Sequence, residues 1–187
     1  RMKRYTALLL SVLLLFSLLP VDAGAGSTLK ASSKIMDFIK SREGCKLTAY
    51  QLEGEEYYTI GYGHYGPDVK KGQTITQARA DELFAQDLKK FENAVNEWNT
   101  KYSLKLTQNK FDALISFTYN CGTGWIGTSW RIAQYTRNNY KYSDGTAVPD
   151  LEIADAFAAI SNGGVGGLVT RRMFEANIFL YGDYGSN

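Results

Sequence analysis

The segment SREGCKLTAYQLEGEEYYTIGYGHYG, residues 41–66, concentrates side chains that can do chemistry. It holds four glutamates, several tyrosines and the only histidine of the chain. A carboxylic acid held against an apolar wall can stay protonated and serve as a general acid. A second carboxylate across a cleft can activate a water, and such a pair is the usual means of breaking a glycosidic bond. These residue types therefore indicate a glycosidase site, with solvated turn glutamates as the alternative.

Glu43 is the candidate acid, because it stands near the end of a predicted helix and directly before a β-rich region. Further along, Gly61 and Gly63 lack side chains, which would let a ligand approach the strand backbone closely. Tyrosine rings offer flat surfaces for sugars, although they also pack in cores. An isolated glutamate on a helix is more often solvated surface, so the residues alone leave both interpretations open.

The residues that other common active sites require are missing. One histidine and two distant cysteines, Cys45 and Cys121, do not suit a zinc site. No serine or cysteine motif accompanies the histidine to indicate a catalytic triad. The glycine-rich segment 162–167 follows a predicted helix and lacks the lysine of a phosphate-binding loop. A disulfide between the two cysteines stays open, because pairing requires Cα atoms within about 7 Å, and two buried thiols are the alternative.

The N-terminal 25 residues differ from the rest of the chain. They have a basic start, an apolar run over 7–19, then Pro20 and small residues, which is typical of a secretory signal peptide. The apolar run is short for a membrane-spanning helix, and an uncleaved membrane anchor is the alternative. Residues 26–33 are rich in glycine and serine and are expected to form a flexible lead-in. We therefore expect a secreted protein, exported to the cell wall or the periplasm.

The remaining body, residues 26–187, carries no net charge. The chain has 21 basic and 19 acidic residues, and residues 1–25 hold three basic and one acidic, which leaves 18 of each. A nucleic-acid-binding protein would be expected to carry a basic excess, so no nucleic-acid partner is predicted. The length of 187 residues suffices for one domain with a core, or for two small lobes.

Apolar spacing and capping residues predict the elements that must position these side chains. Ser32 or Ser33 caps a first helix that ends near Glu43, and two β-rich runs around residues 53–56 predict a hairpin. Capping residues and apolar stripes then predict five helices. Their ranges are 76–98, 107–121, 129–140, 149–161 and 167–181. The sum is an α+β fold with one small sheet.

The motifs REGCKLTAY and YYTIGYGH resemble the catalytic region of the phage-type lysozymes, glycoside hydrolase family 24. The resemblance continues in GQTITQARADELFAQDL, LTQNKFDALISFTYNCG and GLVTRRMFEANIFLYG, and covers nearly all of residues 34–182 in order. It implies a lysozyme-like catalytic domain over 34–187. Such a domain has a small β-hairpin lobe and a mainly helical lobe, with a cleft between them and a long helix joining them.

The same resemblance implies a muramidase, either a phage endolysin or a bacterial autolysin. Such enzymes hydrolyse the β-1,4 link between N-acetylmuramic acid and N-acetylglucosamine in the glycan strand of peptidoglycan. No cofactor and no metal are implied, and a monomer is expected, with membrane contact only through an uncleaved N-terminal segment.

The functional positions of the family correspond to particular residues of this chain. The catalytic glutamate falls on Glu43 as general acid, and the threonine that helps to position the attacking water falls on Thr59. The histidine falls on His64, which we expect to be structural. Asn120 falls where family members have a polar side chain facing the cleft, so it is either a substrate contact or a helix C-terminal cap.

The second carboxylate departs from the family pattern, in which an Asp stands nine positions after the Glu and six before the Thr. Here Thr59 follows Glu43 by sixteen positions, one more than usual. Counting forward from Glu43 reaches Leu52, and counting back from Thr59 reaches Glu53, our candidate for the Asp role. Glu55 is the second candidate, and the third possibility is that neither glutamate takes this role. An inverting reaction would require carboxyl groups about 6.5–9.5 Å apart.

Two further alternatives follow from these departures. Arg171 and Glu175 are spaced as a structural (i, i+4) ion pair, but Arg171 could also pair with Glu43 and favour its charged form. The missing Asp also leaves a rival function, a non-catalytic wall-binding protein that keeps the lysozyme fold.

Overall fold

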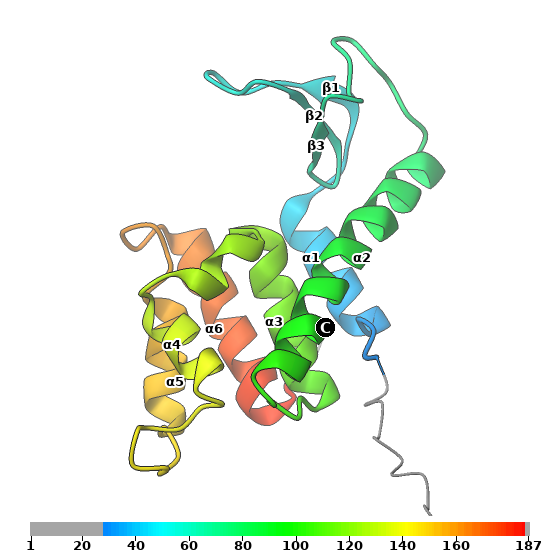
Figure 1. The fold of residues 1–187 in the computed structure, drawn as a ribbon. Helices are drawn as coiled ribbons and strands as arrows, with labels where there is room; N and C mark the ends of the chain where they lie inside the picture. The colour runs from blue at the N-terminus through cyan, green and yellow to red at the C-terminus, as the bar shows by residue number, and fades with distance from the viewer. Residues whose placement is uncertain (1–27, 186–187) are drawn as a thin grey trace, which may run out of the picture.

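The computed structural model describes residues 28–185, so the predicted leader at 1–25 lies outside the described residues. A small sheet and a group of helices form two lobes, and the long helix α2 runs from one to the other (Figure 1). The elements in chain order are α1 (Ser33–Glu43), β1 (Lys46–Tyr50), β2 (Tyr58–Gly61), β3 (His64–Gly66), α2 (Gln77–Lys101), α3 (Gln108–Cys121), the short 3-10 helix η1 (Thr123–Gly127), α4 (Arg131–Arg137), α5 (Asp150–Ala158) and α6 (Gly166–Tyr181). The predicted α+β class with one small sheet is confirmed.

The sheet is antiparallel with strand order β1-β2-β3. In the central strand, Thr59 pairs with Tyr50 on one side and Tyr65 on the other, while Ile60 pairs with His64. The predicted hairpin is confirmed by the antiparallel pairing of β1 with β2, and residues 64–66 add a third strand that the sequence did not predict. That strand is only three residues long, too short to show an alternating pattern in the sequence.

The two glycines near the end of β2 have backbone angles that favour glycine, and the close approach of a ligand to this backbone stays a prediction. Gly61 and Gly63 have φ angles of 66° and 97°, which side-chain-bearing residues rarely adopt. A Cβ atom on Gly61 would lie 3.5 Å from the Cβ of Ala80 on α2. Gly61 therefore makes the tight connection to β3 while the sheet packs on α2.

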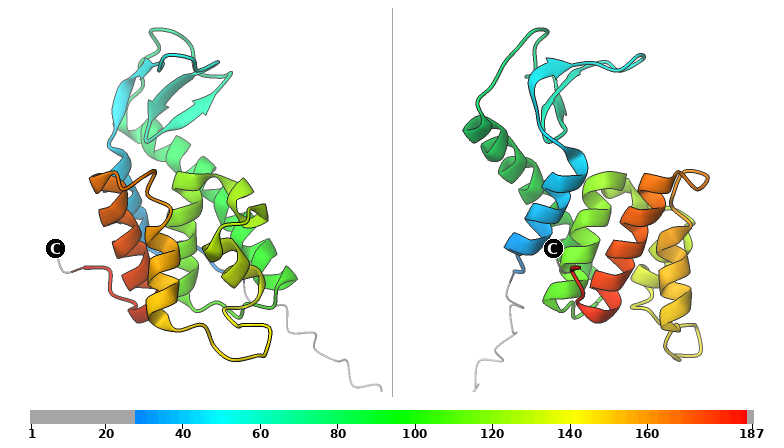
Figure 2. Two further views of the ribbon diagram at one scale, coloured as in Figure 1. Left: turned by 90° about the vertical axis from the view of Figure 1, so that its left-hand side faces the viewer. Right: turned by 180° about the vertical axis from the view of Figure 1, so that it is seen from behind.

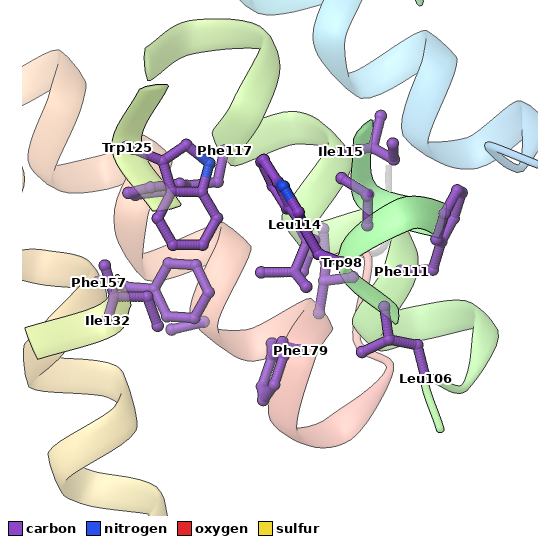
Figure 3. Close-up of a cluster of buried hydrophobic side chains, with 14 of the residues drawn as sticks. Trp98, Leu106, Phe111, Leu114, Ile115, Phe117, Trp125, Ile132, Phe157 and Phe179 are labelled. Carbon is purple, nitrogen blue, oxygen red and sulfur yellow. The ribbon is translucent and has the colours of Figure 1, made fainter. Parts of the chain in front are cut away.

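The main hydrophobic core lies in the helical lobe, around α3 (Figure 3). Phe117 packs edge-on against both Trp125 and Phe157, with ring centroids 5.0 and 5.4 Å apart. Full burial of each such ring contributes about 1.5–3 kcal/mol. Eight consecutive residues of α3, from 111 to 118, are buried, which confirms the expectation that this helix is central.

Helix α1 is fixed at both ends. The Ser32 hydroxyl accepts a hydrogen bond from the Ile35 N–H at 3.3 Å and donates one to Asp112 at 2.6 Å. At the other end, Gly44 terminates the helix with φ 68°, directly after Glu43. Because Ile35 and Ile39 are also buried in the helical core, α1 places Glu43 firmly.

The segment before α1 is held to the domain. The N–H of Leu29 donates to Asn96 at 3.0 Å, and the N–H of Ala31 donates to Glu92 at 2.7 Å. Composition had predicted a flexible lead-in over 26–33, but these long-range hydrogen bonds give residues 29–33 a fixed course. Composition misses them because their partners lie more than 60 residues away.

Most helix ends lie where the capping residues in the sequence predicted them. Thr76 caps α2, Pro149 precedes α5, and Gly182 ends α6 in a left-handed conformation. Helix α4 is shorter than the predicted range 129–140, since Trp130 and not Ser129 is its N-cap residue. Between residues 28 and 185, no helix combines the length and the hydropathy needed to cross a bilayer.

His64 ties the sheet to α2. Its Nδ1 lies 2.8 Å from Asp87 on α2, and its Nε2 lies 2.9 Å from Asp68 in the loop after β3. Burial lowers the pKa of His64, but the hydrogen bonds and charges of the two carboxylates together raise it above the ordinary 6.5. The structural role expected for His64 agrees with these contacts.

This raised pKa makes the stability contributed by His64 depend on pH. The folded state binds the proton more tightly than the unfolded state, so the contribution is complete below about pH 6.5. It falls as the pH rises through the higher pKa of the folded state. We therefore expect the stability difference between wild type and His64→Gln to shrink from about pH 5.5 to about pH 9. Urea unfolding at both values measures it, and a constant difference would contradict the ion-pair account.

Candidate active site

Glu43 is the last residue of α1, with 22% of its side chain exposed. Its Oε1 accepts a hydrogen bond from Nη1 of Arg171 at 2.7 Å. Arg171 comes from α6, 128 positions later, and is almost fully buried. No hydrogen bond from residues 28–185 reaches Oε2 of Glu43, so that oxygen is available to a ligand.

Arg171 belongs to a buried polar network between α3 and α6. Its Nε donates to Oε1 of Glu175 at 3.1 Å, and its Nη2 donates to the carbonyl oxygen of Ser116 at 3.2 Å. The hydroxyl of Ser116 donates to the same Glu175 oxygen at 2.7 Å. Arg171 thus makes both of the ion pairs that the sequence left as alternatives.

Arg172 completes this network from the other side of Glu175. It pairs with Oε2 of Glu175, and its Nε donates to the carbonyl oxygen of Ile160 at 2.8 Å. Two buried cations therefore face two carboxylates, Glu43 and Glu175. Burial lowers the pKa of Arg171, but Glu175 and Glu43 outweigh it and raise that pKa.

Two carboxylates share the buried guanidinium of Arg171. Here Glu175 shares Arg171 with Glu43 and offsets part of its charge. The arrangement holds Glu43 in place through Oε1 and leaves Oε2 without a hydrogen bond from the described residues.

Thr59 is buried in the central strand, with 7% of its surface exposed. Because Ile60 points into the small core against α2, Thr59 points to the opposite face of the sheet. Its cross-strand neighbours on that face are Tyr50 and Tyr65. No hydrogen bond joins Thr59 to Glu43 in this structure.

The candidate second carboxylates lie in a turn of the β1–β2 connection. The N–H of Glu55 donates to the carbonyl oxygen of Leu52 at 3.1 Å, and Gly54 has φ 85°, so Glu53 and Gly54 form the corner. The Glu55 carboxylate accepts a hydrogen bond from the N–H of Leu52 at 3.0 Å. Glu55 is therefore engaged in holding the turn.

Glu53 stands at the exposed corner of the same turn. The β1–β2 connection reaches out from the sheet on the side of α5 and α6 (Figures 1 and 2). No hydrogen bond or ion pair of the described chain joins Glu53 to Glu43 or Thr59. The structure brings Glu43 and Arg171 together, and it leaves Glu53 apart from them.

Asn120 lies near the end of α3, and its Oδ1 accepts a hydrogen bond from Arg172. The capping alternative for Asn120 was wrong, since Gly122 ends α3 with φ 72°. Asn120 also lines a pocket of about 390 Å³ whose other walls come from η1–α4, the α5–α6 connection and α6. Its lining residues are Asn120, Cys121, Trp130, Ala159, Ile160, Asn162, Gly163, Leu168 and Arg172.

The two cysteines do not form a disulfide. Cys45 is an exposed free thiol directly after Gly44, and Cys121 is a half-buried free thiol at the end of α3. Burial raises the pKa of the Cys121 thiol, and the nearby Arg172 only partly offsets this. Both residues are therefore free thiols in this structure, but the alternative of two buried thiols was wrong for Cys45, which is exposed.

The profile of the phage lysozyme family matches residues 40–175, the range that contains α1's last turn, the sheet and the buried network. The chain belongs to the phage lysozyme family. The chain is 35% identical to the endolysin of Bacillus phage B103 over 152 residues. This match covers 79% of this chain and 53% of that protein. It is 37% identical over 160 residues to the endolysin of Lactococcus phage c2, covering 81% of this chain and 60% of that protein.

The chain thus spans between half and two thirds of the length of these two relatives, but nearly all of a shorter one. The endolysin of Salmonella phage P22 is 31% identical over 158 residues, which cover 81% of this chain and 99% of that protein. The matched region of this lysozyme-family chain is therefore the part that these endolysins share.

Solved structures confirm the lysozyme fold. The endolysin from Escherichia coli O157:H7 phage FAHEc1 superposes with a TM-score of 0.65 at 31% identity, covering 84% of this chain and 98% of that one. The muramidase domain of SpmX from Asticaccaulis excentricus superposes with a TM-score of 0.66 at 31% identity, covering 81% and 97%. The lysozyme-family domain therefore includes both lobes.

The sequence did not predict how Ser116, Arg172 and Glu175 connect. Their spacing gave a partial signal, since Glu175 follows Arg171 by four positions and Arg172 by three, both favourable on a helix. Nothing local linked them to Ser116, 59 positions from Glu175, or to Glu43.

Proposed function

We propose that this protein is a peptidoglycan hydrolase, a muramidase that cuts the β-1,4 link between N-acetylmuramic acid and N-acetylglucosamine. The observation that carries the proposal is Glu43, half-buried at the end of α1 and fixed through Oε1 by Arg171, with Oε2 free. Membership of the phage lysozyme family and similarity to phage endolysins support it. The partner is the glycan strand of the bacterial wall.

In the proposed reaction, protonated Glu43 donates from Oε2 to the oxygen that joins the two sugars. The C1–O bond of the muramic acid breaks, and the N-acetylglucosamine leaves with its 4-hydroxyl restored. A water attacks C1 from the opposite face and gives up a proton to a carboxylate base. Thr59 positions this water, and the outcome is inversion at C1.

We assign the base to Glu53. Glu55 is a weaker candidate, because its carboxylate is already bonded to the N–H of Leu52. Glu53 is exposed at the corner of a projecting turn, so the β1–β2 connection must fold toward Glu43 when the glycan strand binds. Closure of a surface turn over bound substrate is a common step in enzyme reactions.

The assignment of the base predicts different effects for two neighbouring glutamates. Glu53→Gln removes the group that accepts the proton from water, so turnover should fall by at least about tenfold, which is roughly 1.4 kcal/mol of barrier. Glu55→Gln keeps the reaction groups and should change turnover less. Initial rates of wall hydrolysis measure both variants, with Glu56→Gln as a matched exposed control. Equal rates for all three variants would show that none of these glutamates is the base.

Asn120 is proposed as a substrate contact, because it is exposed beside the 390 Å³ pocket and its side-chain oxygen is oriented by Arg172. Its amide nitrogen can then donate to a carbonyl oxygen of the bound wall fragment. We further propose that residues 1–25 direct export and that the domain acts as a monomer. Mass spectrometry of secreted protein tests cleavage of the leader.

The rival function is wall binding without catalysis, which only the missing family Asp suggested and to which the similarity to phage endolysins gives no support. Clearing of a suspension of bacterial walls separates the two functions. The proposed muramidase clears the suspension, whereas a pure binding protein cosediments with the walls and leaves their turbidity unchanged.

A further inference from the structure

The two faces of the small sheet differ in character. On the face toward α2, Ile60 packs against Val69 and Leu83, and His64 bonds to Asp87. Side chains alternate between faces along a strand, and directly paired residues share a face. The face away from α2 therefore presents the row formed by Tyr50, Thr59 and Tyr65 across the three strands.

This row is aromatic and accessible on either side of Thr59. Tyr65 is 46% exposed, and its ring meets that of Tyr57 edge-on with centroids 5.5 Å apart. The N–H of Tyr57 donates to the Tyr65 hydroxyl oxygen at 3.2 Å, which fixes the Tyr65 ring. On the other side, the Lys46 ammonium lies 4.3 Å from the centre of the Tyr50 ring.

The surroundings suit a sugar better than an apolar protein surface. Every ring in the row carries a hydroxyl, Thr59 adds another, and the cation of Lys46 sits at the edge. A pyranose presents C–H groups on its faces and hydroxyls around its rim, so it matches a flat ring with polar tips. The Tyr65 hydroxyl accepts from Tyr57 and can still donate its own proton to a ligand.

We propose that Tyr65, supported by Tyr57, is a specificity-determining residue that stacks against a sugar ring of the glycan strand next to the bond that is cut. The inference rests on the proposed function, because Thr59 in the same row is the residue assigned to the attacking water. Tyr65 then sets where the sugar lies relative to Thr59 and contributes to binding more than to the chemical step. Tyr50 extends the same surface on the β1 side.

Binding of a defined wall fragment tests the proposed stacking role of Tyr65 separately from catalysis. Soluble tetrasaccharides of alternating N-acetylglucosamine and N-acetylmuramic acid are titrated by calorimetry into protein carrying Glu43→Gln, which prevents turnover. Adding Tyr65→Ala should raise the Kd by about fivefold, since stacking contributes on the order of 1 kcal/mol and each 1.4 kcal/mol is tenfold. Tyr65→Phe keeps the ring but lacks the hydroxyl, so its Kd should lie between that of the Glu43→Gln parent and that of Tyr65→Ala.

Tyr142→Ala is the matched control, because Tyr142 is a similarly exposed tyrosine in the helical lobe. Equal Kd values for Tyr65→Ala and Tyr142→Ala would overturn the proposal. In the active enzyme, Tyr65→Ala should raise KM and leave kcat within about threefold. A purely structural role would lower kcat as well, together with the thermal midpoint.

A second variant keeps the test decisive if Tyr65→Ala unfolds. Tyr65→Trp retains a flat ring and should show a change in tryptophan emission on adding the tetrasaccharide, beyond that of wild type. An emission change no larger than that of wild type would overturn the proposed stacking role. If wild-type protein fails to cut peptidoglycan, the proposed function fails. If wild type cuts peptidoglycan and Tyr65→Ala has an unchanged KM, only the proposed stacking role of Tyr65 fails.

Discussion

Glu43→Gln is expected to lower the rate of wall hydrolysis by at least about a hundredfold, the size of effect that a positioned general acid commonly supplies. Glutamine has nearly the same shape, and its amide oxygen can still accept the hydrogen bond from Arg171. It has no acidic proton to give to the glycosidic oxygen. The rate is measured from the loss of turbidity of purified walls.

Two controls accompany this prediction. Glu56→Gln alters an exposed glutamate of the same region and should keep near wild-type activity. The thermal midpoint of Glu43→Gln should stay close to that of wild type, since the partly exposed side chain is replaced by an isosteric one. A Glu43→Gln variant that is folded and retains more than about a tenth of the activity would rule out the acid role.

Glu175→Gln should have the largest effect on stability. Glu175 is completely buried and is the shared partner of Arg171, Arg172 and Ser116. Neutralising it leaves two buried guanidinium groups facing the single remaining carboxylate of Glu43. Removing one member of a buried ion pair costs about 3–5 kcal/mol. The free energy of unfolding, measured in urea, should fall by an amount in this range.

The chain offers a surface ion pair as the matched control. Glu82 pairs with Arg79 at 2.8 Å, and both side chains are well exposed, at 63% and 46%. Glu82→Gln should cost less than about 1 kcal/mol, as exposed pairs usually do. If the two variants lost the same stability, the network around Glu175 would not be the organising feature of the α3–α6 interface.

Local sequence signals predicted the framework that positions Glu43. A capping serine, two buried isoleucines at (i, i+4) and a terminating glycine define α1, and all lie between Ser32 and Gly44. The long helix α2 was also predictable, because its apolar stripe runs from Ala80 to Trp98, about five turns, and Thr76 caps it. Strand β3 was not, since three residues give no period and the strand depends on its pairing with β2.

The site was only partly predictable for a related reason. Glu43 and Thr59 could be placed by motif, but the partner of Glu43 is 128 residues away. The sequence could therefore offer Glu43 only as one of two possible partners of Arg171, the other being Glu175. The register of Glu53 depends on the turn around Gly54, whose positive φ angle sends the chain outward. No periodic pattern constrains such a turn. Counting along the sequence therefore identifies the residues of the turn but does not show where they lie in space.

The identity of the new chain end in digested peptidoglycan tests the central claim most directly. Purified walls are digested, the products are reduced with borohydride, and the reduced sugar is identified by mass spectrometry. The account predicts reducing ends on N-acetylmuramic acid with wild-type protein, and no such ends above background with Glu43→Gln. Reducing ends on N-acetylglucosamine, or the same muramic acid ends from both proteins, would contradict it.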